Sequence, residues 1–185
     1  MDTKAEWTLP IRLGDVLQVG LVVRDLRKAM ERYWTLLGIG PWKIYTYAPP
    51  ALRHATVRGV RTDYSMRIAC AQAGPTQLEL IQPLQGPSIY MEHLAAKGEG
   101  LHHIQSRVEA DIQDVLAAFA AQGIGVLMGG KFGEGEFHYL DTEPTLGVIY
   151  EIFQRKSRPE PEAVYPPDAT CPESSPQRHP GTTRP

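Results

Sequence analysis

The amino-acid sequence predicts an α+β fold built from two tandem copies of one unit, in which a strand, a helix and three further strands follow one another. Two observations lead to this prediction. Residues 17–40 resemble residues 102–125 at a nearly constant offset, and each of these segments is followed by three runs of β-forming residues. One helix per copy, set against several strands, is typical of an α+β architecture in which each sheet curls around a cleft.

The internal repeat is visible when the two segments are written one after the other. Residues 17–40 read LQVGLVVRDLRKAMERYWTLLGIG, and residues 102–125 read HHIQSRVEADIQDVLAAFAAQGIG. Each copy opens with a short run of β-forming residues, and in this run Gln18 falls on His103. The repeat therefore selects these two positions as equivalent.

The helix of each copy has matching start and stop signals. Asp25 and Asp111 precede runs of apolar residues at helical spacing, as helix-capping residues do. Gly38 and Gly123 end these runs, where a residue with positive φ is favoured. The strand runs predicted after the two helices are 42–47, 64–71 and 77–81 in the first copy, and 125–128, 137–141 and 148–153 in the second.

The length of 185 residues favours one domain with short flanking segments. The abrupt rise in proline content near the C-terminus predicts a segment without regular structure, because it offers little apolar surface to bury; the alternative is that Val164 and Tyr165 dock along the domain. The expected parts are an N-terminal extension (1–13), a single domain (14–155) with module one at about 14–84, a linker helix at about 86–97 and module two at about 99–155, and a Pro-rich irregular tail (156–185).

Composition and charge argue against several classes of partner. Apolar residues make up 42% of the chain and the formal net charge is −2, so neither nucleic acid nor an anionic membrane is expected to bind. No apolar run approaches the roughly 20 residues that a membrane-spanning helix needs. Cys70 and Cys171 form no disulfide framework, and the N-terminus does not resemble a signal peptide, which together predict a cytoplasmic protein.

The repeat also points to a metal site. Glu79 and Glu151 are single carboxylates in apolar strands that end the two copies, as Gln18 and His103 are matched at their beginnings. A lone strand glutamate commonly faces solvent, but a buried one needs compensation, and two related carboxylates repel each other. A divalent cation between them resolves both costs. One imidazole, one amide oxygen and two carboxylates suit Mn²⁺, Fe²⁺, Co²⁺, Ni²⁺ or Zn²⁺.

Three motifs carry a resemblance to a known family. They are LELIQPLQGPS at residues 78–88, GLHHI at 100–104 and GVIYEIF at 147–153. With the repeat, they make the chain similar to the vicinal oxygen chelate (glyoxalase, bleomycin resistance and extradiol dioxygenase) superfamily over about residues 16–154. Within it, the resemblance is greatest to the methylmalonyl-CoA epimerase-like and glyoxalase-like branch.

The resemblance implies paired βαβββ modules, a metal ion in the cleft, a homodimer, and chemistry that passes through an enolate held by the metal. The ligand positions of the family fall on Gln18, Glu79, His103 and Glu151. These are the same four positions that the repeat selects.

The sequence departs from the epimerase pattern at two positions. The family usually has His where Gln18 stands, and an amide oxygen binds softer metals less strongly than imidazole does. The epimerases also carry a glutamate two residues before a glycine in the second-strand region. If that glycine is Gly59, Val57 replaces the glutamate, and the second base is left open. The polar residues nearby are His54, Arg58 and Tyr64.

The leading hypothesis is a metal-dependent isomerase or epimerase of a small carbonyl compound, such as an acyl-CoA or an α-substituted ketone, with Glu151 as the general base. The alternatives are a small-molecule or antibiotic-binding protein of the same fold, and a ring-cleaving dioxygenase or glyoxalase-type lyase. The alternative for the aromatic pair after Gly40 is core or dimer packing, and strand alternation allows only one of the pair 138–139 to face the cleft. Candidate substrate-binding residues are Tyr45, Tyr47, Arg58, Tyr64, His138 and Tyr139.

Overall fold

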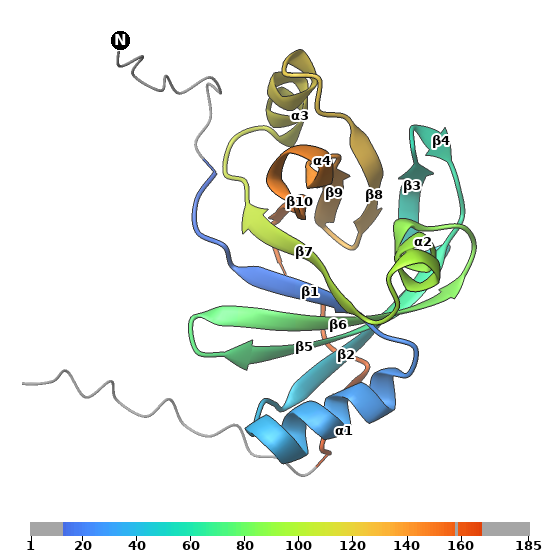
Figure 1. The fold of residues 1–185 in the computed structure, drawn as a ribbon, viewed down its shortest axis with the longest axis vertical. Helices are drawn as coiled ribbons and strands as arrows, with labels where there is room; N and C mark the ends of the chain where they lie inside the picture. Colours follow the sequence, from blue (N-terminus) through green and yellow to red (C-terminus); the bar gives the residue numbers. More distant parts are fainter. Residues whose placement is uncertain (1–12, 158, 168–185) are drawn as a thin grey trace, which may run out of the picture.

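The computed structural model describes residues 13–157 and 159–167, and its strands form one curled, open sheet (Figure 1). In chain order the elements are β1 (Gln18–Val22), α1 (Leu26–Leu37), β2 (Trp42–Tyr47), β3 (Leu52–Val57), β4 (Val60–Arg61), β5 (Ser65–Ala73), β6 (Thr76–Gln85), α2 (Ile89–Ala96), β7 (Gly100–Arg107), α3 (Ile112–Ala121), β8 (Val126–Phe132), β9 (Gly135–Leu140), α4 (Glu143–Leu146), β10 (Ile149–Arg155) and β11 (Ala163–Tyr165).

The strand order shows that the two copies of the repeat fold alike. The sheet runs β11-β2-β5-β6-β1-β7-β10-β9-β8-β3-β4, so the first copy contributes β2-β5-β6-β1 and the second β8-β9-β10-β7. In each copy the first strand pairs with the last in parallel, and the two first strands pair antiparallel at the centre of the sheet. The predicted α+β fold of two βαβββ modules is confirmed.

The helices begin and end where the sequence signals predict. The side chains of Asp25 and Asp111 each accept a hydrogen bond from a backbone N–H in the first turn of α1 and α3, at 3.0 and 2.8 Å. Gly38 and Gly123 follow the helices with φ of 66° and 77°, which glycine adopts without the strain of a Cβ. In the part of the chain that the structure describes, no helix has the length and apolar character needed to cross a membrane.

Apolar residues pack on both faces of the sheet. Leu26 and Met30 of α1 share a buried cluster with Trp42 outside the first module, and Val115 of α3 shares one with Ile152 outside the second. A third and larger cluster lies on the concave inner face, where α2 also packs. The helices thus hold the two halves of the sheet in shape and leave part of the inner face open.

One hairpin of the first module pairs with the second module. Strands β3 and β4 form an antiparallel pair, and β3 continues the sheet beyond β8. The sequence pattern did not predict these strands, since charged residues interrupt the run. The backbone is also irregular there, because His54 and Arg58 have positive φ. The hairpin forms because β8 offers an open edge, a partner far away along the chain.

The prediction of an irregular tail is wrong at Ala163–Tyr165. These residues form β11, which pairs antiparallel with the open edge of β2. Two further contacts attach the strand: the Glu162 carboxylate accepts hydrogen bonds from Thr46 at 2.8 and 2.9 Å, and the Arg27 guanidinium lies 4.2 Å from the centre of the Tyr165 ring. Proline-rich composition obscured a short strand that exists only because an edge is available. The rest of the predicted tail, from residue 168, and the extension before residue 13 lie outside the described residues.

Candidate metal centre

A cleft of about 330 Å³ opens on the concave face of the sheet. Its walls come from both modules, because the strands of each copy curl toward the other. Glu79 on β6 and Glu151 on β10 line the cleft as symmetry-related residues of the two last strands. The cleft therefore lies where the internal repeat brings its matched positions together.

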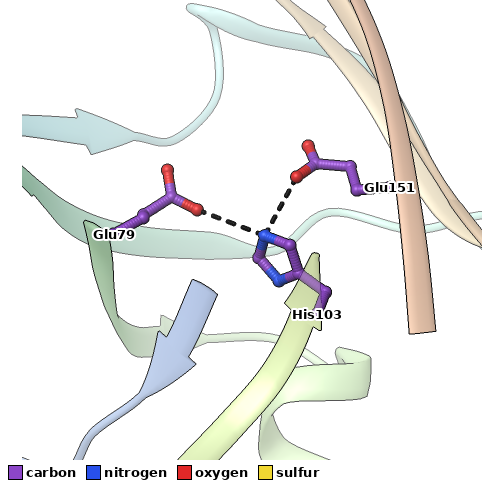
Figure 2. Close-up of side chains that lie close together, drawn as sticks. All are labelled: Glu79, His103 and Glu151. Carbon is purple, nitrogen blue, oxygen red and sulfur yellow. Dashed lines mark ion pairs between the residues drawn. The ribbon is translucent and has the colours of Figure 1, made fainter. Parts of the chain in front are cut away.

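A buried Glu–His–Glu group lies at the base of the cleft. Nε2 of His103 is 3.0 Å from Oε2 of Glu151 and 3.6 Å from Oε2 of Glu79, and the two carboxylates approach the ring from different strands (Figure 2). One potential ligand atom from each residue lies within 4.8 Å of the others. All three residues are buried, with His103 fully enclosed. Such spacing suits side chains that share one cation.

Gln18 also lines the cleft and carries an amide oxygen. Its Nε2 donates to Oε1 of Gln77 at 2.8 Å, which fixes the orientation of the amide. Oε1 of Gln18 is then buried and has no hydrogen-bond partner among the residues that the structure describes. An unpaired buried acceptor is costly, and a cation removes that cost.

The residues at this position fit a divalent metal ion. They offer an amide oxygen, an imidazole nitrogen and two carboxylates, a borderline-hard ligand set. Among the described residues, neither Nε2 of His103 nor Oε1 of Gln18 has an aligned hydrogen bond. Gln105 donates from Nε2 to Oε2 of Glu151 at 2.7 Å and so orients that carboxylate. Gln18, Glu79, His103 and Glu151 would hold the ion.

The surroundings of His103 set which ring nitrogen faces the carboxylates. Nδ1 of His103 lies 3.1 Å from Nδ1 of His102. Burial, with the neighbouring His103, lowers the pKa of His102 well below its ordinary value, and a neutral His102 offers Nδ1 as an acceptor in the tautomer that carries its proton on Nε2; His103 then donates from Nδ1. This hydrogen bond leaves Nε2 of His103 for the metal, an arrangement common among histidine ligands.

The protonation of His103 gives the first prediction. Burial lowers its pKa, but the charges of Glu151 and Glu79 outweigh burial and raise it above 6.5. A raised folded-state pKa stabilises the metal-free protein at low pH, and this contribution is lost as the pH rises through that pKa. A metal ion competes with this proton for His103, so the affinity of the protein for the metal rises as the pH rises.

We therefore expect the midpoint of thermal unfolding of the EDTA-treated protein to fall as the pH rises above about 6.5, while the increase in that midpoint caused by Mn²⁺ grows. Differential scanning calorimetry across this range measures both. The control is His103→Gln, which should lose this pH-dependent component. An unchanged slope in the variant would assign the effect to other groups.

The structure brings together only part of the predicted substrate-binding set. Tyr45, Tyr47 and Tyr139 line the cleft, and their role as substrate contacts stays a prediction. Arg58, Tyr64 and His138 do not line it. Each of these three has a partner elsewhere: Arg58 pairs with Glu92 at 2.7 Å, the Tyr64 hydroxyl donates to the carbonyl of Gly129 at 3.0 Å, and His138 Nε2 lies 2.8 Å from Glu136 Oε1.

Several residues around the metal centre were not predicted. Gln105 and Gln77 lie two positions from His103 and Glu79, so strand alternation puts each on the same face as its neighbour. That signal was present in the sequence. Cys70 is different: it is next to Glu79 only through the pairing of β5 with β6, with Sγ 3.8 Å from Oε1 of Glu79.

The chain matches a family and a set of solved structures that agree with this fold. Residues 17–139 match the family described as the Glyoxalase/Bleomycin resistance protein/Dioxygenase superfamily. The uncharacterized protein YqjC of Bacillus subtilis (strain 168) is 27% identical over 142 residues, which are 75% of this chain and 90% of that protein.

Two similar solved structures are methylmalonyl-CoA epimerases. The enzyme from Mycobacterium tuberculosis has a TM-score of 0.56 at 20% identity. The match covers 78% of this chain and 90% of the chain of that enzyme. A variant of the Streptomyces coelicolor enzyme, in complex with 2-nitronate-propionyl-CoA, has a TM-score of 0.57 at 23% identity and covers 79% of this chain and 100% of its own. At these identities the likeness shows a shared fold.

Proposed function

The chain belongs to the Glyoxalase/Bleomycin resistance protein/Dioxygenase superfamily, and we propose that it is a divalent-metal-dependent isomerase or epimerase of a carbonyl compound. The observation that carries this proposal is the buried group of Glu79, His103 and Glu151 at the base of a cleft. The epimerase structures of the same fold, one holding an acyl-CoA analogue, support a carbonyl substrate and, more narrowly, an acyl thioester.

In this proposal the protein binds a carbonyl oxygen at the metal centre and moves a proton at the neighbouring carbon. A divalent cation, when bound, supplies Lewis acidity that stabilises negative charge on that oxygen. Glu151 is the general base. Gln105 donates to its Oε2, which leaves Oε1 to accept the proton from carbon.

Epimerisation also needs an acid on the opposite face of the substrate carbon. Val57, which replaces the epimerase glutamate if Gly59 is the matching glycine, has an apolar side chain that packs against the inner-face cluster. Glu79 is the other carboxylate of the buried group, and it approaches His103 from a different strand than Glu151 does (Figure 2). We therefore assign Glu79 the second proton transfer.

The ring-cleaving dioxygenase alternative fits the ligand set less well. That chemistry uses two histidines and one carboxylate to hold Fe²⁺. Here Gln18 occupies one histidine position, and the described group contributes a single imidazole with two carboxylates. The balance of ligands favours proton transfer.

The second prediction tests the proposed reaction directly. Metal-loaded protein in D₂O should catalyse exchange of the α-proton of methylmalonyl-CoA or of a ketone with a substituted α-carbon. Proton NMR measures the rate at which the α-proton signal is lost. Glu151→Gln should slow the exchange by about 100-fold or more, because a general base typically contributes a factor of that size.

The matched control is Glu31→Gln, which makes the same change on an exposed position of α1 and should leave the exchange rate unaltered. The proposal is abandoned if the metal-loaded protein exchanges no carbonyl compound and Glu151→Gln changes nothing.

A further inference from the structure

Two buried tyrosine hydroxyls form a pair in the wall of the cleft. Tyr139 lies on β9 and Tyr90 on α2, and their hydroxyl oxygens are 2.7 Å apart. Both side chains are almost fully buried, and both line the cleft. The ring centre of Tyr139 lies 5.0 Å from that of His103, and Tyr139 is opposite Glu151 in the β9–β10 pair. The two hydroxyls therefore belong to the surroundings of the metal centre.

This pair of hydroxyls has one proton more than it uses. A phenol keeps its proton at neutral pH, so each hydroxyl is both a donor and an acceptor. Within the pair one hydroxyl donates and the other accepts, and the accepting hydroxyl still has a proton to donate. Among the residues that the structure describes, no other hydrogen bond joins the hydroxyl of Tyr90 or that of Tyr139. A buried donor needs an acceptor, so a group that enters the cleft is expected to supply one.

A second pair of hydroxyls, outside the cleft lining, has acceptors for both of its protons. The hydroxyl oxygens of Tyr150 and Ser106 lie 2.7 Å apart, and Ser106 donates to the backbone carbonyl of Asp15 at 2.9 Å. Because the proton of Ser106 is used in that bond, Tyr150 donates to Ser106. A pair with a structural role is thus complete within the protein, whereas the pair in the cleft keeps a donor.

Tyr139 is better placed than Tyr90 to use the remaining proton at the metal centre. The ring of Tyr139 packs against His103 itself. The ring of Tyr90 packs instead against His102, with ring centres 5.1 Å apart. When Tyr90 donates to Tyr139, the oxygen of Tyr139 is held in place and its proton is left for a ligand. A hydroxyl that accepts a hydrogen bond also becomes a stronger donor, because the two bonds polarise each other.

We propose that the Tyr139 hydroxyl donates a hydrogen bond to the carbonyl oxygen of the substrate, and that Tyr90 is a positioning residue that donates to Tyr139. This inference rests on the proposed function and adds a second source of stabilisation at the same site. Negative charge develops on the carbonyl oxygen when Glu151 removes a proton from the neighbouring carbon, and a fixed donor stabilises that charge. The proton of Tyr139 stays on Tyr139, and the proton transfers remain with the carboxylates.

The third prediction measures this hydrogen bond without turnover. Propane-2-nitronate, supplied as the preformed anion, carries its charge on oxygens next to a planar carbon and so stands in for an enolate. It is titrated into Co²⁺-loaded protein, and the visible absorption of the cobalt reports binding. The Kd of Tyr139→Phe should be about tenfold or more above that of the wild type, as expected for the loss of one hydrogen bond to a charged oxygen. The cobalt content should stay at the wild-type value.

Two further variants separate positioning from packing. Tyr90→Phe should raise the Kd by a smaller factor than Tyr139→Phe does, and the double variant Tyr90→Phe, Tyr139→Phe should bind no more weakly than Tyr139→Phe alone, because Tyr90 acts through Tyr139. Additive losses would overturn the role of Tyr90. Tyr150→Phe is the matched control, since it makes the same change in the pair outside the cleft, and it should keep the wild-type Kd.

An unchanged Kd in Tyr139→Phe, an equal loss in Tyr150→Phe, or no binding of the nitronate by the wild type would overturn the inference. In the deuterium-exchange assay, Tyr139→Phe should lower kcat and leave KM nearly unchanged, because the charge on oxygen develops only as the proton leaves carbon. The two assays fail separately. Exchange that Tyr139→Phe leaves unaltered contradicts the hydrogen bond, whereas nitronate binding that depends on Tyr139 without any exchange contradicts the proposed reaction.

Discussion

Replacement of Gly20 by alanine is expected to abolish tight metal binding while most of the sheet stays folded. Gly20 faces His103 across the β1–β7 pair, and a Cβ at this position would lie 1.9 Å from Cε1 of the imidazole and 2.4 Å from both ring nitrogens. Real carbon atoms do not approach so closely, so the ring must move. The imidazole of His103 is fully buried and packs against His102 and Tyr139. A shift of the ring therefore moves Nε2 away from the carboxylates.

The expected loss of metal affinity for Gly20→Ala is about 100-fold or more, since displacement of a ligand exceeds the effect of removing an outer-shell partner. Overpacking should also cost about 1–3 kcal/mol of unfolding free energy. Titration of Mn²⁺ or Co²⁺ by calorimetry and thermal unfolding measure the two effects. Gly125→Ala is the control, because a Cβ there meets no atom within 4 Å. Wild-type metal affinity in Gly20→Ala would show that His103 is not a ligand.

Replacement of Glu79 by glutamine is expected to have opposite effects on the metal-free and metal-loaded protein. In the metal-free protein Glu79 and Glu151 are buried near each other, with His103 between them. The amide removes one buried charge and most of the repulsion while keeping the shape. The metal-free variant should therefore unfold at the same temperature as the wild type or at a higher one.

The metal-loaded comparison should reverse this order. A ligand at a thousand times its dissociation constant stabilises a protein by about 4 kcal/mol, and Glu79→Gln should lose most of that increment because the amide is a weaker, uncharged ligand. Scanning calorimetry with EDTA and with Co²⁺ gives both values. Glu31→Gln on exposed α1 serves as the control for the substitution itself. Destabilisation of the metal-free variant by several degrees would mean that Glu79 has a structural role in place of a metal-binding one.

The predicted parts of the fold depend on residues close together in the chain, whereas the unpredicted parts depend on partners that are distant in the chain. The modules, their helices and the caps at Asp25 and Asp111 follow from local periodicity and from residues a few positions away. Strands β3, β4 and β11 have weak local patterns. They form because the edges of β8 and β2 are open, and those edges are distant along the chain.

The same distinction applies to the candidate substrate contacts. Alternation on β9 allows only one of His138 and Tyr139 to face the cleft, but it does not say which. The pairing of β9 with β10 and the curl of the sheet place Tyr139 in the cleft and turn His138 toward Glu136. Arg58 similarly pairs with Glu92 of α2, a contact that no local pattern predicts.

The sequence by itself determined the matching of Gln18 with His103 and of Glu79 with Glu151, because a duplicated module repeats its pattern and so marks equivalent positions. Tertiary structure decided which contacts support those four side chains: Gln105 donates to Glu151, and Gly20 makes room for His103. These contacts cross from one strand to another. Cross-strand neighbours depend on the register of segments far apart in the chain, and a pattern read along the chain does not contain that register.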